Sequence, residues 1–215
     1  MNKKIFLLGT LILILMVFIS FSVIKQSSKI NVKPVEKPLV EELSVYLPVN
    51  EEDPMLGSPG SPITVTEFFS LECPSCAKRH AEIISYIEKN PGTVRLLVKG
   101  IAQENWLGHK NIFPLLALQC AQDQNQYWNF LNLAIKPNKF NESTVDEIIS
   151  TLNLNSATFK DCLQNEFYKN TIEKEQISLK NLGLSQVPNI FINNKKLNLT
   201  EDVKIADILN GVLSK

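Results

Sequence analysis

The sequence predicts an α/β fold in which an all-helical segment separates two parts that contain strands. Strand-like runs occur at residues 63–69 and 94–98 and return at 188–192, whereas residues 105–183 show only helical patterns. The chain has 215 residues, of which 44% are hydrophobic, so it can bury a substantial core. This composition excludes wholesale disorder.

The first part is predicted to be a strand, a helix and a second strand. Residues 63–69 are rich in β-branched and aromatic side chains, which favour a buried strand. Helix-forming sequence begins at Cys73 and continues until Pro91 and Gly92 end it. Because a further strand pattern follows at 94–98, we expect a βαβ unit with parallel strands.

The helical segment, about 103–183, is expected to contain several short helices. A capping-box pattern at Ser143 predicts that one helix begins there. Two others are expected at 156–165 and 167–182, the second of them closed by Gly183. The aromatic side chains expected in the core of this segment are Tyr127, Trp128 and Phe130.

The last part is predicted to be a hairpin and a closing helix. Asn193 and Asn194 tolerate positive φ and can turn the strand at 188–192 into a second strand at 196–199. Thr200 is expected to cap the closing helix. The apolar stripe of this helix is formed by Ile205, Ile208, Leu209 and Val212.

The N-terminus predicts export. Lys3 and Lys4 precede residues 5–24, which include no charged residue. A helix of that length rises about 30 Å, the thickness of a hydrocarbon core. We therefore expect residues 1–25 to be a signal anchor or a cleaved signal peptide.

Proline density predicts a tether between this segment and the folded domain. Six of the eleven prolines lie between residues 26 and 62, and such a density favours extended chain. The tether is assigned to residues 26–60, with one short helix possible at 40–47. The folded domain is assigned to residues 61–215.

The charge pattern excludes a nucleic-acid-binding protein. The chain has 22 basic and 22 acidic residues, but Lys3, Lys4 and Lys25 lie at the N-terminal end, which leaves 19 basic against 22 acidic residues in the remainder. Arg79 and Arg95 are the only arginines. A protein that binds nucleic acid needs a basic surface to contact phosphates.

The most informative feature is a pair of cysteines, Cys73 and Cys76, at the start of the predicted helix. The free N–H groups and the positive end of the helix dipole stabilise a thiolate at Cys73, and such sites lower a thiol pKa from about 8.5 to about 3.5–7.5. Cys73 is then the expected attacking sulfur and Cys76 the more buried resolving thiol. Pro74 fits an early helical position, where its missing N–H would be unsatisfied anyway.

Two other interpretations of the CxxC pair stay open at this point: half of a metal site, or an inert structural bridge. Zinc would need two more ligands. The candidates in the chain are His80, His109, Cys120 and Cys162. We expect His80 to be a partly exposed helix residue, and His109 and Trp106 to lie in a loop that enters the helical segment.

These residues together resemble the active site of the thioredoxin superfamily. Residues 68–76, which precede a helix, are similar to its CxxC segment, and Val187 and Pro188, ahead of an apolar strand, are similar to its cis-proline loop. The long helical segment resembles the DsbA branch of the superfamily. The resemblance covers residues 58–215 and implies a thioredoxin-like fold with a helical insertion.

The resemblance implies a role for each site residue. Cys73 is the nucleophile and Cys76 the resolving cysteine, Pro188 is the cis-proline packed against their disulfide, and X–Pro bonds are those that commonly adopt cis. Val187 offers backbone groups to a substrate strand. Glu67, six residues before Cys73, matches a buried carboxylate that takes the proton of the resolving thiol. The alternatives are an ordinary trans proline and a solvent-facing glutamate.

The resemblance also implies a structural disulfide between Cys120 and Cys162, because some DsbA relatives have a second disulfide in the helical subdomain. Both cysteines lie at helical spacing to apolar neighbours, and two free thiols are a liability in an oxidising compartment. The alternative is that each is a separate, buried hydrophobic side chain.

The function implied is that of a protein-disulfide oxidoreductase that introduces disulfides into unfolded or reduced exported proteins, with no bound cofactor or metal. A DsbB-like, quinone-linked membrane oxidase would re-oxidise it. It would work in the periplasm, anchored in the inner membrane by residues 5–24 or released from it. Ser75 stands where DsbA oxidases typically have histidine, which leaves a disulfide isomerase or reductase open. A metal-binding protein or a purely structural surface protein are further alternatives.

Overall fold

The structure is a computed structural model that describes residues 47, 53–105, 107–135, 140–200 and 202–214. The expected signal segment and most of the tether lie outside these residues, as does the expected short helix at 40–47 apart from Leu47. No helix in the described part of the chain is long and apolar enough to span a membrane.

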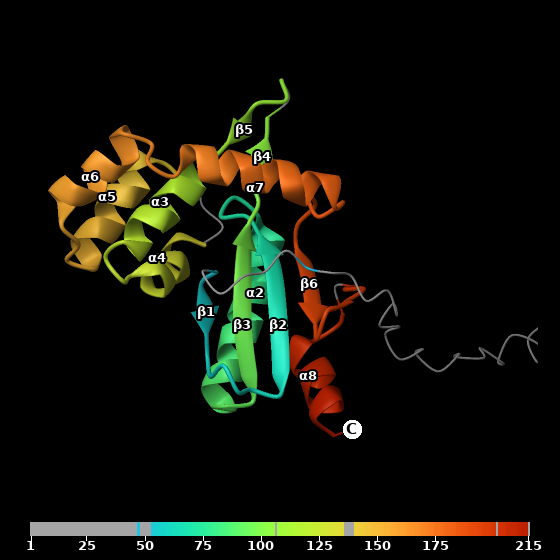
Figure 1. The fold of residues 1–215 in the computed structure, drawn as a ribbon. Helices are drawn as coiled ribbons and strands as arrows, with labels where there is room; N and C mark the ends of the chain where they lie inside the picture. The colour runs from blue at the N-terminus through green and yellow to red at the C-terminus, as the bar shows by residue number, and fades with distance from the viewer. Residues whose placement is uncertain (1–46, 48–52, 106, 136–139, 201, 215) are drawn as a thin grey trace, which may run out of the picture. The chain divides into compact units, whose positions relative to one another are not determined.

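A five-stranded mixed sheet with the strand order β1-β3-β2-β6-β7 forms the centre of the fold (Figure 1). Its strands are β1 Met55–Leu56, β2 Ile63–Phe69, β3 Val94–Gly100, β6 Asn189–Ile192 and β7 Lys195–Lys196. β2 and β3 run parallel, and the other neighbouring strands are antiparallel. Asn193 and Asn194 make the last turn at positive φ. The predicted βαβ unit and closing hairpin are therefore confirmed.

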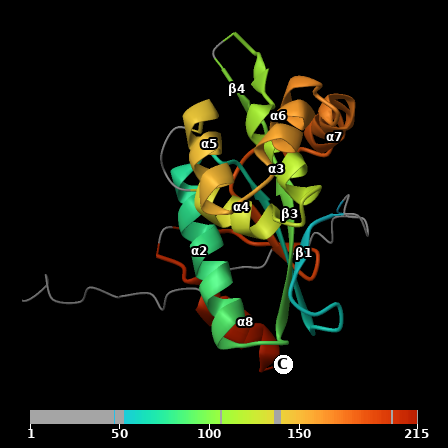
Figure 2. The same ribbon diagram turned by 90° about the vertical axis from the view of Figure 1, so that its left-hand side faces the viewer.

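Helices cover both faces of this sheet (Figures 1 and 2). They are α2 (Pro74–Lys89), α7 (Lys169–Asn181) and α8 (Ile205–Leu213). α2 and α8 lie against one face, where Val65 shares a core with Ile83 and Leu209. α7 crosses the other face, where Phe68 packs with Leu179. Successive residues of β2 thus face different layers.

The remaining helices form the predicted insertion beside the sheet (Figure 1). They are α3 (Phe113–Gln122), α4 (Tyr127–Ala134), α5 (Glu142–Thr151) and α6 (Ser156–Gln164). Phe130 and Phe159 stack with ring centres 5.6 Å apart, in a core continuous with that of the sheet. Of the aromatic residues expected in this core, Tyr127 and Phe130 are buried and Trp128 is partly buried.

One stretch inside the predicted helical segment is not helical. β4, Gln103–Glu104, and β5, Lys110–Asn111, form a separate antiparallel hairpin that projects past α7 (Figure 1). The side chain of Asn105 accepts hydrogen bonds from the N–H groups of Leu107 and His109, both at 3.0 Å. These local polar contacts stabilise a turn in place of a helix.

The expectation that Ser143 caps α5 is wrong. Asn141 is the N-cap, and its side chain accepts a hydrogen bond from the N–H of Thr144 at 3.0 Å. Asparagine caps a helix as well as serine does, so the helix begins earlier and Ser143 lies inside its first turn.

Thr200 does not cap the closing helix either. α8 begins at Ile205, because the guanidinium of the buried Arg79 donates hydrogen bonds to the backbone oxygens of Thr200 at 2.9 Å and Val203 at 2.6 Å. These bonds hold the segment before α8 as a loop against α2.

The sheet extends into residues that were assigned to the tether. β1 pairs with the middle of β3 and forms an edge of the sheet. Gly57 follows at a φ of +98°, and a Cβ atom there would lie 2.5 Å from the backbone oxygen of Val94. Only glycine permits this close approach at a positive φ.

Candidate active site

The two cysteines of the CxxC segment are joined at the first turn of α2. Cys73 is the N-cap, with extended backbone, and Pro74 is the first helical residue. A disulfide joins Cys73 to Cys76, with Cα atoms 5.2 Å apart. The N–H of Cys76 donates a hydrogen bond to Sγ of Cys73 at 3.1 Å. A helix N-terminus therefore points directly at the first sulfur.

The surroundings of the two sulfurs differ. Cys73 is half-buried, whereas Cys76 is fully buried. The first turn of α2 contains no acidic residue, and the hydroxyl of Ser75 lies 3.3 Å from Sγ of Cys73. Both features favour a negative charge on Cys73 once the bond opens. An incoming thiolate can reach this sulfur and not the other.

The Val187–Pro188 peptide bond is cis and lies in the loop between α7 and β6. β6 pairs with β2, with Asn189 opposite Phe68. Continuing this register carries the loop towards the end of β2, from which the chain enters the CxxC segment. Val187 and Cys73 pack against the same core.

A cleft of about 430 Å³ opens beside the cis-proline loop. Its lining includes Gln103, Glu104, Lys110, Gln176, Lys180 and Val187. The cleft is lined mainly by polar side chains, and the loop beside it can offer backbone N–H and C=O groups. Such a site suits the binding of an extended polypeptide.

Glu67 lies on β2 beneath α2 and is fully buried, so it does not face solvent. Its Oε2 lies 2.7 Å from Nδ1 of His80, which is only 2% exposed. The expectation that His80 is partly exposed is therefore wrong. It lies four positions after Cys76, which places both on the buried face of α2.

Both ring nitrogens of His80 face hydrogen-bond acceptors. Nδ1 faces Glu67, and Nε2 lies 3.3 Å from Oδ1 of Asn132 on α4. Burial by itself lowers the pKa of His80, but the hydrogen bond to Glu67 and its negative charge outweigh burial, and the pKa is raised above its ordinary value. The site thus favours an imidazolium beside a carboxylate.

The helical pattern held a signal for this burial. The buried residues of α2 are Cys76, Arg79, His80, Ile83 and Tyr86. Their spacing marks one face of the helix, and His80 lies in the middle of it. Periodicity could therefore have identified His80 as buried, although it could not have identified its partner.

A second buried charge lies on the other face of the sheet. Lys99 of β3 is 5% exposed, and its Nζ donates hydrogen bonds to Asp53 and, at 2.6 Å, to Glu175 of α7. Burial lowers the pKa of Lys99, but the two carboxylates outweigh burial and raise it. The sequence does not identify Lys99 as buried, because no local pattern distinguishes an inward lysine in a strand from an outward one.

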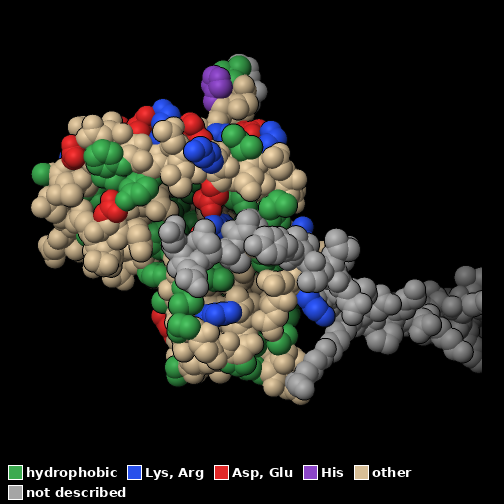
Figure 3. Space-filling model, viewed as in Figure 1, with side chains coloured by type: hydrophobic (Ala, Val, Ile, Leu, Met, Phe, Trp, Pro, Cys, Tyr) green, Lys and Arg blue, Asp and Glu red, His purple; other side chains and the backbone are tan. Residues whose placement is uncertain are grey.

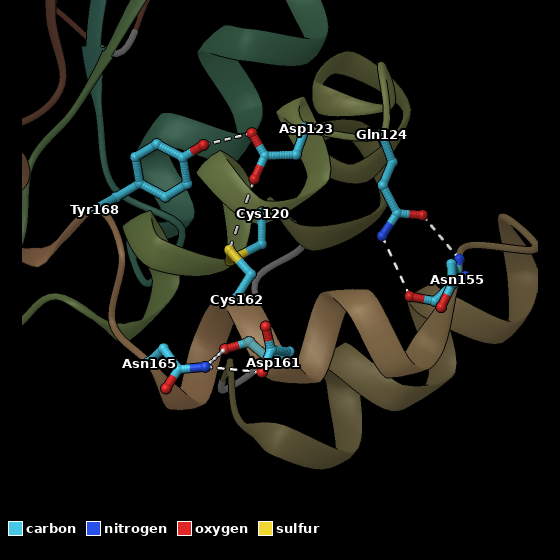
Figure 4. The surroundings of a disulfide bond; sticks show 8 residues. All are labelled: Cys120, Asp123, Gln124, Asn155, Asp161, Cys162, Asn165 and Tyr168. Carbon is cyan, nitrogen blue, oxygen red and sulfur yellow. Dashed lines mark hydrogen bonds between the residues drawn. A yellow bond between two sulfur atoms is a disulfide. The ribbon is translucent and has the colours of Figure 1, made fainter.

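Cys120 of α3 and Cys162 of α6 form a second disulfide inside the insertion, with Cα atoms 5.9 Å apart (Figure 4). Asp123 lies beside it, with one carboxylate oxygen 3.9 Å from Sγ of Cys162. The other oxygen accepts a hydrogen bond from the hydroxyl of Tyr168 (Figure 4). This bond, with burial adding to it, raises the pKa of Tyr168 to about 12.

His109 is exposed on the β4–β5 hairpin, where Figure 3 shows histidine atoms in purple, and Trp106 lies outside the described residues. In the described part of the chain, no three His, Cys, Asp or Glu side chains are arranged to hold a metal ion. The structure thus places the CxxC pair and the Glu67–His80 pair on or beneath α2, and the pairing of β6 with β2 carries the cis-proline loop towards the end of β2 that precedes the CxxC segment.

Comparisons with known proteins agree with this arrangement. A family model described as thioredoxin matches residues 49–209. The chain is 24% identical over 156 residues to disulfide bond formation protein D of Bacillus subtilis. The matched region is 66% of this chain and 68% of that protein. It is 25% identical over 186 residues to a Rickettsia bellii protein whose name is that of a protein-disulfide oxidoreductase, covering 80% of the chain and 68% of that protein.

A solved structure shows the same fold. The crystal structure of DsbA from Chlamydia trachomatis superposes with a TM-score of 0.61 and 16% identity, over 79% of this chain and 94% of that one. At this identity the structural likeness shows the fold alone.

Proposed function

Because this chain belongs to the thioredoxin family and is a DsbA-like protein-disulfide oxidoreductase, we propose that it introduces disulfide bonds into exported proteins through Cys73 and Cys76. The observation that carries the proposal is the pair of unequal sulfurs at the start of α2. One sulfur is accessible and faces a helix N-terminus, and its partner is buried.

The oxidising reaction takes two exchange steps. A substrate thiolate attacks Sγ of Cys73, the Cys73–Cys76 bond breaks, and Cys76 leaves with the bonding electrons. A second substrate thiolate then attacks the substrate sulfur of this mixed disulfide, and Cys73 leaves as a thiolate. The substrate loses two electrons and gains a disulfide, and the CxxC pair is left reduced.

The geometry at Cys73 favours this direction. A stabilised Cys73 thiolate is a good leaving group in the second step, and it stabilises the reduced pair relative to the oxidised one. The free N–H groups of α2 and the N–H of Cys76 supply that stabilisation.

The other site residues are assigned supporting roles. Pro188 is assigned the role of packing against the disulfide, and Val187 that of offering its backbone to an extended substrate segment in the adjacent cleft. Glu67 exchanges a proton with the buried Cys76. Cys120 and Cys162 act as a structural bridge in the insertion.

The proposal includes export and re-oxidation. Residues 5–24 have the length and composition of a membrane segment or signal, so the domain is assigned to the periplasm or an equivalent compartment, anchored or released. The two electrons gained from each substrate pass to a DsbB-like, quinone-linked membrane oxidase, which restores the Cys73–Cys76 bond.

A second candidate is a disulfide isomerase or reductase, which would run the same residues from the reduced state. One observation favours it: the residue before Cys76 is Ser75, an uncharged side chain that contacts Cys73 through a hydroxyl. A hydroxyl stabilises a thiolate less than a charged imidazole does.

The experiment that separates these functions is the equilibrium reduction potential of Cys73–Cys76 against glutathione. Cys120 and Cys162 stay in place, and alkylation followed by mass spectrometry of the Cys73 peptide reports the redox-active pair alone. If the protein introduces disulfides as a strong oxidant, we expect a reduction potential of about −120 mV. A potential at or below about −230 mV would assign the protein to the reductases or isomerases.

Substitution of the cysteines tests the chemistry itself. Cys73→Ser is expected to abolish oxidation of a reduced, unfolded test protein, because no sulfur is left for the first attack. Cys76→Ser is expected to trap a mixed disulfide at Cys73 when offered a disulfide. Full activity in Cys73→Ser would exclude the proposed function.

A further inference from the structure

Glu67 and His80 form a buried acid–base pair directly behind the redox-active cysteines. Their side chains are 0% and 2% exposed, and Oε2 of Glu67 lies 2.7 Å from Nδ1 of His80. Cys76 precedes His80 by one helical turn on the same face of α2. The pair therefore lies on the face of α2 that also buries Cys76, one helical turn further along the helix.

One oxygen of this pair has no partner. Oε1 of Glu67 is buried and accepts no hydrogen bond from any residue that the structure describes. A desolvated carboxylate oxygen without a donor is unfavourable, so such an atom needs an explanation. Reduction of the disulfide turns Cys76 into a thiol, which is a donor one turn from the pair.

The other end of the pair leads to the surface. His80 borders an open, largely apolar depression of about 220 Å³ between α2 and α4, lined also by Ala77, Ala81, Ile84 and Asn132. Its Nε2 lies 3.3 Å from Oδ1 of Asn132, which is exposed. Glu67, His80 and Asn132 thus form a continuous polar chain from the core to solvent.

We propose that His80 relays protons between Glu67 and solvent, so that the buried Cys76 exchanges its proton through the α2–α4 face and not through the substrate-facing side. This inference rests on the proposed function and deepens it, since it concerns the step in which Cys76 attacks. His80 acts through Glu67 and is a positioning residue, and it does not touch the reacting sulfurs.

When Cys76 attacks a mixed disulfide at Cys73, its proton moves to Oε1 of Glu67, its sulfur bonds Sγ of Cys73, and the partner sulfur leaves as a thiolate. The proton then leaves Glu67 for solvent through the imidazole of His80, and the pair returns to a carboxylate beside an imidazolium, the state that the raised pKa of His80 favours when the disulfide is formed. One proton leaves the protein for each Cys73–Cys76 bond formed.

Of the groups that pack around His80, Glu67 is the one that forms a titrating pair with it. β2 contributes Glu67, and α4 contributes the neutral Asn132. Tyr127 of α4 is buried, and its burial and the nearby carboxylates raise the pKa of its phenol, so it stays uncharged. Glu88 of α2 lies on the lining of the depression.

The test separates the two steps of oxidation by glutathione disulfide. Reduced full-length protein is mixed with the reagent in a quench-flow instrument, and acid-quenched samples are analysed by mass spectrometry. Attack by Cys73 depends on reagent concentration, and attack by Cys76 does not. His80→Gln is compared with His109→Gln, which makes the same change at the exposed histidine of the hairpin.

We expect His80→Gln to slow the Cys76 step at least about tenfold at neutral pH. This is less than the roughly hundredfold or more that a directly acting acid–base group contributes, because Glu67 stays in place. The difference should close at alkaline pH, where hydroxide removes the Cys76 proton directly, and the Cys73 step should keep its rate. If the Cys76 step in His80→Gln has the same rate and the same pH profile as the Cys76 step in His109→Gln, the relay is overturned. A wild-type protein that never forms the Cys73–Cys76 bond overturns the proposed function instead.

If His80→Gln does not fold, the proton relay is tested on the wild-type protein. Nitrogen NMR follows both histidines of the chain, and His109→Gln assigns them. We expect His80 to carry protons on both ring nitrogens to a pH above the ordinary pKa of histidine, about 6.5, in the oxidised protein. A midpoint of His80 at or below about 6.5 overturns the relay.

Discussion

Asp123 shows how one carboxylate serves two neighbours at the scale of single residues. One of its oxygens binds the hydroxyl of Tyr168, and the other lies 3.9 Å from Sγ of Cys162. If the second disulfide opened, a thiolate at Cys162 would face this negative charge and would be disfavoured. The carboxylate therefore protects the second disulfide from exchange with the reactive CxxC pair.

Asp123→Asn is expected to lower the pKa of Tyr168 from about 12 towards its ordinary value of 10. An amide oxygen still accepts the hydrogen bond, but it does not repel a phenolate. Because the pKa of Tyr168 is raised in the folded protein, its hydrogen bond with Asp123 stabilises the fold fully below pH 10. This stabilisation is lost as the pH rises through about 12. Carbon NMR of the tyrosine rings measures the titration.

Asp161→Asn is the matched control for this prediction. Its carboxylate binds Asn165 and lies in the same insertion (Figure 4), so it should leave the titration of Tyr168 unchanged. Equal titration of Tyr168 in both variants would contradict the assignment of the raised pKa to Asp123.

At the scale of elements, the end of β3 is fixed between two helices. The side chain of Gln176 on α7 accepts a hydrogen bond from the N–H of Ala102 and donates one to the backbone oxygen of Gly100, both at 2.9 Å. From α3, Leu115 packs so closely that a Cβ atom on Gly100 would lie 2.3 Å from its Cδ2. The sheet and the insertion thus meet at a position that accommodates no side chain.

Gly100→Ala is expected to lower the free energy of unfolding by about 1–3 kcal/mol, because Leu115 must move within a packed core. Gly211→Ala is the matched control, since a Cβ atom there meets nothing within 4 Å and the residue lies within α8. It should raise the free energy of unfolding by about 0.5–1 kcal/mol through helix propensity. Urea unfolding measures both, and a loss of stability in neither variant would show that β3 and α3 are not tightly packed.

At the scale of the whole molecule, the elements that could be predicted from the sequence are those whose structure depends on residues that are neighbours in the chain. The strand at 63–69 and the helix after Cys73 follow from patterns that the tertiary structure reinforces. The loop before α8 could not be predicted, because Arg79 reaches it from a helix more than a hundred residues earlier.

The same division applies to the site. Cys73, Cys76 and Pro188 are identified by their own chemistry and neighbours in sequence. The pairing of Glu67 with His80, and the contact of His80 with Asn132, join three elements. Such contacts are decided by packing and have no local pattern.

The second disulfide is expected to contribute to the stability of the whole domain. Replacing Cys120 and Cys162 with alanine should lower the free energy of unfolding by about 4 kcal/mol, because the bond links residues 42 apart and restricts the unfolded chain. Replacing Cys73 and Cys76, 3 residues apart, should cost much less. Urea unfolding of both double variants measures the difference, and equal losses would contradict this account.

The place where the chain enters the sheet determines how the domain bears tension. A pull on the residues before Leu47 is resisted first by the burial of Leu47 in the core with Phe68 and Leu179. The ion pair of Asp53 with Lys99 and the pairing of β1 along β3 resist it next. Glu175 of α7 shares that load through the same lysine. The force therefore enters the sheet at its β1 edge and on the face that α7 covers. Tension on the N-terminal chain is thus not applied directly to α2, where the Cys73–Cys76 disulfide lies.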